Sequence, residues 1–166
     1  IDPKYILEKD RILEIHTSVN PYLQKMLEDA NQAGVPMKIL SAYRSFSTQA
    51  ELKSAYRITY GYGANKFSAE QGYSEHQLGT TVDLTTEKIG AVLSGFDKTE
   101  SYKWLLENAY KYGFVISYPK ENTYYIFEPW HWRFVGLSLA QVIHDRGAYF
   151  YSMDQREIDQ NLVTIF

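Results

Sequence analysis

Apolar residues recur at helical spacing in the first part of the chain. Asn20-Pro21 is a favourable helix start, because Asn caps the first turn and Pro suits the first helical position. Gly34 is a favourable stop, since Gly readily adopts the left-handed conformation that ends many helices. The apolar positions between them are Leu23, Met26, Leu27 and Ala30. The pattern therefore predicts an amphipathic helix between Asn20 and Gly34.

Three more helices are predicted from periodicity together with start and stop residues. The spans are Ser47 or Thr48 to about Arg57, Glu100 to Tyr112 before Gly113, and a helix around Leu139, Val142 and Ile143 that stops at Gly147. Thr48 and Glu51 stand at the spacing of a capping box, which supports the first of these starts. The Gly-rich, polar segment 60–72 is predicted to be a loop.

Short apolar or alternating runs predict strands between these helices. Within Thr81-Val82-Asp83-Leu84, alternation places Val82 and Leu84 on one face and Asp83 on the other. The other predicted strands are Met37 to Leu40, ending at Ser41, and a pair, Phe114 to Tyr118 and Tyr124 to Phe127, around a turn at 119–122. Several connections are too short for helical crossovers, which favours an α+β fold around a small antiparallel sheet with flanking helices.

Composition narrows the class of protein. The chain has 166 residues and no internal repeat, so we expect a single domain over residues 1–166. A net charge of −3 without a basic run argues against a nucleic-acid-binding surface. The chain contains no apolar stretch of about 20 residues that would span a membrane. Its start, Ile1-Asp2-Pro3-Lys4, does not resemble a signal peptide, but a trimmed chain leaves secretion open.

The absence of cysteine restricts any metal site to histidine and carboxylate ligands. His76 and Asp83 lie in one Gly-containing segment, 74–83, and His131 lies in a second, 128–133. Two imidazoles and one carboxylate are a usual ligand set for catalytic zinc with an open fourth position. Asp83 also has apolar neighbours, so a buried charge there needs a partner such as Zn²⁺. We therefore predict that His76, Asp83 and His131 bind zinc.

Glu128 is the predicted general base of this centre. It precedes His131 by three residues and can reach a water activated by the metal without binding the metal itself. On a straight strand, residues 128 and 131 would face opposite sides. Either Pro129 bends the chain or a tighter turn begins there, and the sequence leaves both open.

Two further residues are suited to hold a substrate carboxylate. Arg44 lies between a predicted strand and a predicted helix, where its guanidinium can bind a carboxylate through two parallel hydrogen bonds. Ser74 precedes His76 by two residues, so an extended backbone would point both side chains the same way. A site that binds the free C-terminal carboxylate of a peptide beside an activated water is expected to be a carboxypeptidase site.

Several motifs resemble those of D-alanyl-D-alanine carboxypeptidases of the VanY and LdcB type. They are Ser41-Ala42-Tyr43-Arg44-Ser45, the run from Ser74 to Asp83, Glu128-Pro129-Trp130-His131-Trp132, and the segment from Trp104 through Tyr118-Pro119. The resemblance covers roughly residues 37–137. It implies the fold shared by lysostaphin, these carboxypeptidases and the hedgehog signalling domain, with zinc as cofactor. It also implies that Gln49 and Ser74 help Arg44 and that Trp130 forms a pocket wall.

The same resemblance implies a substrate and a location. We expect a D,D-carboxypeptidase that removes the C-terminal D-Ala from peptidoglycan stem peptides or their precursors. Because peptidoglycan lies outside the cytoplasm, an extracytoplasmic location, in the cell envelope or secreted, is expected. A monomer without nucleic-acid partners is also expected.

The sequence also bears on four other functions, of which one stays open and three are disfavoured. An L,D-carboxypeptidase acting on tetrapeptide stems shares the motifs and is left open. A phage-lysin type of endopeptidase is disfavoured by Arg44, which suits a free carboxylate. A zinc-containing binding module without turnover has no use for a base such as Glu128. A non-haem iron oxygenase usually has its first His and carboxylate two residues apart, whereas His76 and Asp83 are seven apart.

Overall fold

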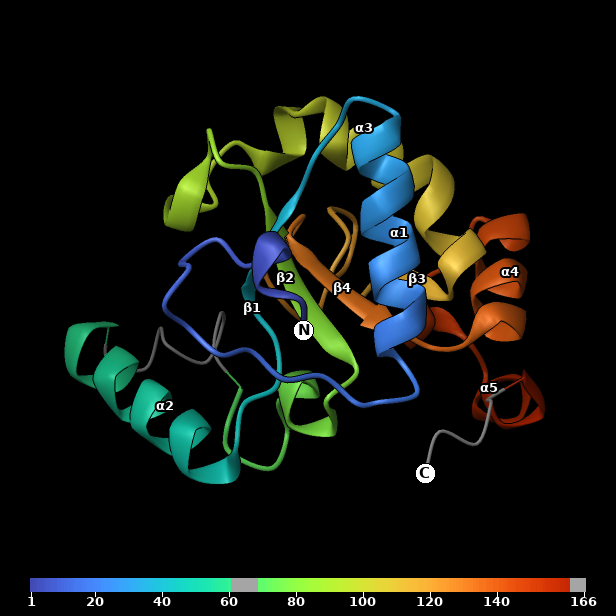
Figure 1. Ribbon diagram of the computed structural model, residues 1–166. Coiled ribbons are helices and arrows are strands. Elements are labelled where there is room, and N and C mark those ends of the chain that lie inside the picture. Colours follow the sequence, from blue (N-terminus) through green and yellow to red (C-terminus); the bar gives the residue numbers. More distant parts are fainter. Residues whose placement is uncertain (61–68, 162–166) are drawn as a thin grey trace.

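The computed structural model describes residues 1–60 and 69–161 (Figure 1). The helices are α1 (Asn20–Gln32), α2 (Phe46–Tyr60), α3 (Glu100–Asn108), α4 (Leu137–Arg146) and α5 (Gln155–Asn161). The strands are β1 (Lys38–Ser41), β2 (Thr81–Thr85), β3 (Phe114–Ile116) and β4 (His131–Phe134). Short 3-10 helices include η3 (Glu75–Leu78), η6 (Ala109–Tyr112) and η7 (Phe150–Ser152). Among the described residues, no helix combines the length and apolar character needed to cross a membrane.

The strands form one antiparallel sheet in the order β1-β2-β4-β3. This arrangement confirms the predicted α+β class. In the register of β2 and β4, Asp83 lies opposite His131 and Val82 lies opposite Trp132. Because side chains alternate along a strand, Asp83 and His131 share one face of the sheet, and Val82 and Trp132 share the other.

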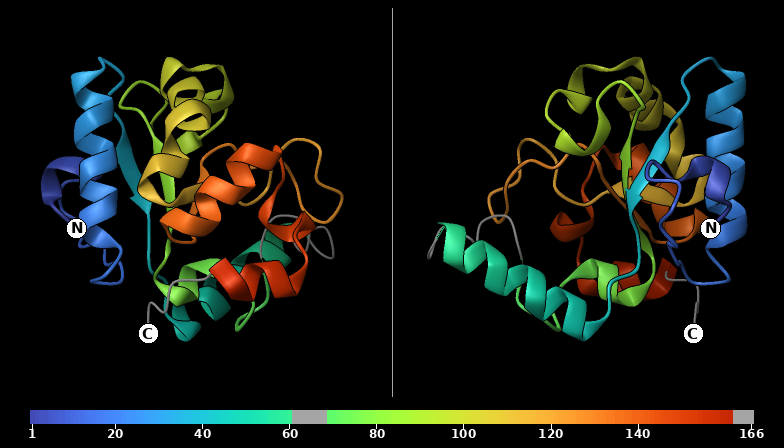
Figure 2. Two further views of the ribbon diagram at one scale, coloured as in Figure 1. Left: turned by 90° about the vertical axis from the view of Figure 1, so that its right-hand side faces the viewer. Right: turned by 60° about the vertical axis from the view of Figure 1, so that its left-hand side comes forward.

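The main hydrophobic core fills the space between the sheet and α1. The apolar face of α1 consists of the predicted residues Leu23, Met26, Leu27 and Ala30, all buried. They join Val82, Leu84 and Trp132 in one cluster, where burying each large apolar side chain contributes about 1.5–3 kcal/mol. Figure 2 shows α1 on one side of the sheet and α2 on the other. The second side is therefore left for polar side chains of the sheet.

The predicted helices are present, except that the helix predicted over Glu100 to Tyr112 is α-helical only as α3 and continues as the 3-10 helix η6. Two helix caps also differ from the prediction. Asn20 is the first residue of α1 and makes no side-chain capping hydrogen bond, because the backbone turn from His16 already leads into the helix. Ser45, rather than Ser47 or Thr48, caps α2, since its Oγ accepts a hydrogen bond from the amide of Thr48 at 3.1 Å. The Ser45 hydroxyl therefore satisfies one of the orphan amides of the first turn, two residues earlier than the cap predicted at Ser47.

The predicted strand over Tyr124–Phe127 is wrong. β3 pairs with β4 instead, and the chain between them crosses the same side of the sheet as α2 (Figure 2). The Asn122 side chain explains the loop, because its Oδ1 accepts hydrogen bonds from the amides of Tyr124 and Tyr125 at 3.2 and 2.7 Å. Such local bonds compete with a strand ladder. Most of the predicted loop 60–72 lies outside the described residues.

Candidate metal centre and substrate pocket

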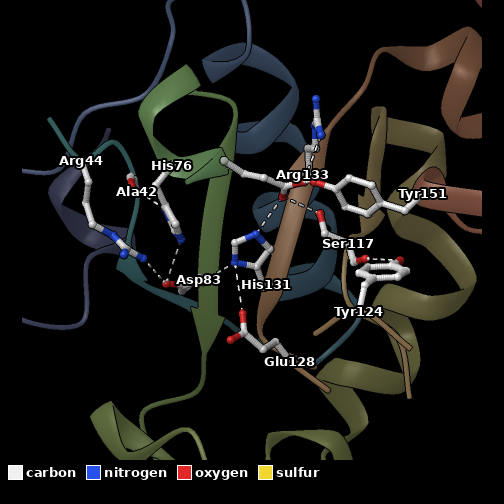
Figure 3. A network of polar contacts seen from close by, with 11 residues as sticks. Ala42, Arg44, His76, Asp83, Ser117, Tyr124, Glu128, His131, Arg133 and Tyr151 are labelled. Carbon is white, nitrogen blue, oxygen red and sulfur yellow. Dashed lines mark hydrogen bonds and ion pairs between the residues drawn. The ribbon is translucent and has the colours of Figure 1, made fainter. Parts of the chain in front are cut away.

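Three elements bring His76, Asp83 and His131 together on the polar face of the sheet (Figure 3). His76 comes from η3, while Asp83 and His131 are opposed residues of β2 and β4. One possible ligand atom of each residue lies within 4.8 Å of the others, and all three residues are buried. The antiparallel register thus joins ligands that are 48 residues apart in the sequence.

The ring of His76 is held in one orientation. Its Nδ1 lies 2.7 Å from the carbonyl oxygen of Ala42, to which it can donate a hydrogen bond. Its Nε2 lies 3.3 Å from Oδ2 of Asp83. Nε2 is therefore the nitrogen of His76 that faces the centre.

After η3, Gly79 turns the chain into β2. Its φ of +67° is a conformation that favours glycine.

In His131 the two ring nitrogens have the reverse roles, with Nε2 bonded outside the centre and Nδ1 facing it. Its Nε2 lies 2.9 Å from Oε2 of Glu75, so this nitrogen is occupied by a carboxylate outside the centre. Its Nδ1 lies 3.2 Å from Oδ1 of Asp83 and 3.6 Å from Oε2 of Glu128. A ligand histidine in metalloproteins usually has its second nitrogen hydrogen-bonded in this manner. Nδ1 is therefore the nitrogen available to a metal.

The electrostatics of the three residues suit a divalent cation. Burial lowers the pKa of His76, which favours the neutral imidazole that metals bind. Burial alone would raise the pKa of Asp83, but His76 and His131 hold it below its usual range. Burial alone would lower the pKa of His131, yet hydrogen bonds and charges of Asp83 and Glu75 raise it to about 10. Carboxylates that attract a proton this strongly also attract a metal ion, so the donor set fits Zn²⁺.

Glu128 reaches the centre through a tight turn. The amide of His131 donates to the carbonyl oxygen of Glu128 at 3.1 Å, closing a turn over Pro129 and Trp130 just before β4. This turn decides the geometry that the sequence leaves open. The Glu128 carboxylate is buried, and this burial raises its pKa to about 7. A carboxyl group with this pKa can both accept and donate a proton near neutral pH.

A cavity of about 560 Å³ opens over these residues. The predicted substrate-binding residues Arg44, Gln49, Ser74 and Trp130 all line it. The guanidinium of Arg44 donates to Oε1 of Gln49 at 3.1 Å and lies 3.4 Å from Oδ2 of Asp83. Gln49 is itself fixed, because its Nε2 donates to the carbonyl oxygen of Ala69 at 2.8 Å. Arg44 therefore lies at the wall of the cavity, beside the metal centre.

Ser74 lines the cavity, but the backbone that follows it differs from the prediction. An extended backbone from Ser74 to His76 was expected, but η3 begins at Glu75 and coils the chain. The structure also shows a residue that the sequence motifs do not single out, Glu75, bonded to His131. No local signal identifies it, because its four side-chain partners lie between 42 and 76 residues away.

Comparison with known proteins agrees with this geometry. The family described as "VanY: D-alanyl-D-alanine carboxypeptidase" matches residues 13–137. The chain belongs to this family. The match confirms the resemblance drawn from the motifs and extends it toward the N-terminus. A VanY-family domain therefore supplies α1, the sheet and the three candidate metal ligands.

Over the aligned residues, two curated relatives are 38% and 34% identical to the VanY-family chain. "Putative carboxypeptidase YodJ" of Bacillus subtilis is 38% identical over 128 residues, covering 74% of this chain and 47% of the relative. The "D-alanyl-D-alanine carboxypeptidase" of Enterococcus faecalis is 34% identical over 146 residues, covering 80% of this chain and 53% of the relative. The chain thus spans about half the length of these two relatives.

Solved structures of the VanY type have the same fold. The LdcB LD-carboxypeptidase has a TM-score of 0.78 at 30% identity, covering 93% of this chain and 73% of that chain. VanYB in complex with D-alanine-D-alanine has a TM-score of 0.72 at 32% identity, covering 86% and 88%. A VanY E175A mutant in complex with Zn(II) has a TM-score of 0.72 at 34% identity, covering 83% and 82%. The fold expected from the motifs is therefore confirmed.

Proposed function

We propose that this protein is a zinc-dependent D,D-carboxypeptidase that removes the C-terminal D-Ala from peptidoglycan stem peptides or their precursors. One observation carries the proposal. A three-ligand metal centre, a buried carboxylate of raised pKa and a cavity-lining arginine lie together in one pocket. Structures of VanYB with D-alanine-D-alanine and of VanY with Zn(II) support the substrate and the metal.

In this proposal, Nε2 of His76, the carboxylate of Asp83 and Nδ1 of His131 hold the zinc ion. When bound, zinc lowers the pKa of a coordinated water and polarises the scissile carbonyl. The outward-facing nitrogen of each imidazole keeps its own hydrogen bond, to the carbonyl oxygen of Ala42 for His76 and to Glu75 for His131. These bonds fix the rings in orientations that turn the other nitrogen to the metal.

Glu128 is the proposed general base and then the general acid. Its Oε2 lies 3.6 Å from Nδ1 of His131, close enough to contact a water held at the same centre. A dication at the neighbouring ligands favours the ionised carboxylate, which is the form that takes a proton from the attacking water. Glu128 then returns this proton to the departing amine of D-Ala, so the proton count balances across the reaction.

Arg44 is the proposed anchor of the free C-terminal carboxylate. Its guanidinium is planar and has several N–H donors, which suits a two-point contact with a carboxylate. Gln49, bonded to one guanidinium nitrogen, is proposed to fix its position, and Ser74 to donate a further hydrogen bond. Trp130 is proposed as an apolar wall for the substrate. Such an anchor selects chain ends, so it favours a carboxypeptidase over an endopeptidase.

The proposed substrate also implies where the protein acts. Because peptidoglycan stem peptides lie outside the cytoplasmic membrane, we propose an extracytoplasmic location, in the cell envelope or secreted. We further propose that residues 1–166 act as one domain and as a monomer.

A second candidate activity is that of an L,D-carboxypeptidase, which removes D-Ala from a tetrapeptide stem. The similarity to the LdcB LD-carboxypeptidase favours it, since that structure has a TM-score of 0.78 with this chain. The metal centre and the carboxylate anchor serve both reactions. The two activities differ in the residue that the pocket must accept on the inner side of the scissile bond.

The decisive experiment measures D-Ala release together with zinc content. Purified protein is incubated with pentapeptide and tetrapeptide stems, with and without a chelator. Release from the pentapeptide that is lost with the metal supports the D,D activity. Release from the tetrapeptide alone moves the protein to the L,D class. Bound zinc without cleavage of either peptide contradicts both carboxypeptidase proposals and favours a binding module.

A further inference from the structure

Glu75 is a buried carboxylate with an unusually complete set of hydrogen bonds. Only 5% of the residue is exposed. Its Oε2 accepts from Ser117 Oγ at 2.6 Å and lies 2.9 Å from His131 Nε2. Its Oε1 accepts from Arg133 Nη1 at 2.9 Å and from the Tyr151 hydroxyl at 2.6 Å. Both oxygens therefore have two partners each, which compensates for burying the charge.

Glu75 lies against a candidate metal ligand and acts there as a hydrogen-bond acceptor. Ser117 Oγ, Arg133 Nη1 and the Tyr151 hydroxyl all donate to its carboxylate. The 2.9 Å contact with His131 Nε2 is then a hydrogen bond in which that nitrogen carries the proton and donates it. Nδ1, on the opposite side of the ring, then has its lone pair free for a metal.

The Tyr151 contact comes from a part of the chain beyond the family match. The match ends at residue 137, and Tyr151 lies in η7, between α4 and α5. η7 is tied to the sheet because Phe150 packs in a hydrophobic cluster with Val115, and the guanidinium of Arg133 lies 4.1 Å from the centre of the Phe150 ring. The C-terminal segment therefore reaches back to the sheet, where Tyr151 lies beside Arg133 and Ser117 (Figure 3). There the Tyr151 hydroxyl donates a hydrogen bond to Glu75.

We infer that Glu75 and Tyr151 are positioning residues that orient His131 for zinc, so that the C-terminal segment is part of the metal centre. The inference rests on the proposed function, because it takes His131 as a zinc ligand. Glu75 fixes the tautomer and the rotation of the imidazole, and Tyr151 fixes one oxygen of Glu75. Neither residue needs to contact the substrate.

The test compares zinc affinities, measured by competition with a chromophoric chelator. Glu75→Gln keeps the shape of the side chain but removes its charge, and we expect zinc affinity to fall about 10- to 100-fold. Tyr151→Phe removes one hydroxyl from a half-exposed ring, so the protein will fold, and we expect a loss of about threefold. At saturating zinc, Glu75→Gln should lower kcat and leave KM for the peptide unchanged.

Tyr149→Phe is the matched control. Its hydroxyl lies in the same segment but bonds to Glu121 at 3.1 Å, on the surface. This variant should bind zinc as the parent does, while thermal unfolding of the zinc-free proteins shows whether Tyr149→Phe and Tyr151→Phe are equally stable.

The outcomes separate this inference from the proposed function. Parent-like zinc affinity in both Glu75→Gln and Tyr151→Phe overturns the inference, even if the parent releases D-Ala. An equal loss of zinc affinity in Tyr149→Phe and Tyr151→Phe also overturns it, because any change in this segment would then weaken zinc binding, with or without a contact to Glu75. A parent that binds zinc but cleaves neither peptide contradicts the proposed function, and the affinities of the variants still decide the inference.

Discussion

At the scale of single residues, Glu128 is buried and lies beside the candidate metal centre. Glu128→Gln keeps the size of the side chain but cannot take a proton from water. We expect kcat to fall by about 10²–10⁴-fold with zinc content unchanged. The measurement is D-Ala release alongside metal analysis, with the exposed Glu107→Gln as the matched control. Near-normal turnover in Glu128→Gln would show that another group moves the proton.

A substitution of Arg44 should affect substrate binding more than the catalytic step. Loss of a charged hydrogen-bond donor to the substrate carboxylate should raise KM about 10- to 100-fold, with a smaller effect on kcat. The measurement compares Arg44→Ala with Arg156→Ala, an exposed arginine of α5. It also compares free-acid with C-terminally amidated peptides. If the parent cleaves both peptides equally well, the anchor role of Arg44 is wrong.

At the scale of elements, the junction between η6 and β3 depends on Gly113. Its φ is +80°, and a Cβ added there would lie 2.6 Å from Cε2 of Phe134 and 3.1 Å from the backbone of Gly136. This crowding would push apart β3 and β4, and β4 carries His131. The positive φ and the close approach together favour glycine at the turn into β3.

The matching prediction concerns stability. Gly113→Ala should lower the free energy of unfolding by about 2–4 kcal/mol, because backbone strain adds to the clash. Gly34→Ala is the control, since Gly34 has φ +78° but no atom within 4 Å of an added Cβ. It should cost only the backbone part, about 1–2 kcal/mol. Urea unfolding measures the free energy of unfolding of both variants. Equal losses would show that Phe134 moves away from the added methyl group without destabilising the protein.

At the scale of the whole molecule, the candidate metal centre joins η3 and β2 to β4, which follows them only after a long intervening stretch of chain. A ligand that binds only the folded state stabilises it, by about 2.7 kcal/mol at 100 times its dissociation constant. A chelator should therefore lower the melting temperature of the zinc-loaded protein. His76→Ala should abolish this difference. His144→Ala should keep it, because His144 stacks on Tyr110 away from the centre. A persistent difference in His76→Ala would place the zinc elsewhere.

Much of the fold follows from local pattern. The apolar residues of α1, the two faces of β2 and the glycine after α4 follow from local periodicity and backbone preference, and the structure confirms each of them. The predicted strand at Tyr124–Phe127 failed because a single Asn122 side chain satisfies the amides that a ladder would need. Its β-favouring composition could not reveal that competition.

For the candidate site, the sequence alone determined the family, because the motifs that contain Arg44, His76 and His131 occur together and in order. The same motifs contain the residues proposed as metal ligands and general base. Only the tertiary structure decided which nitrogen of each imidazole faces the centre, how Glu128 reaches it through a turn, and that Glu75 and Tyr151 lie behind His131. The reason is physical. A local pattern records the periodicity and burial of neighbouring residues, whereas these contacts join residues up to 76 positions apart, and only packing of the sheet against its flanking elements brings them together.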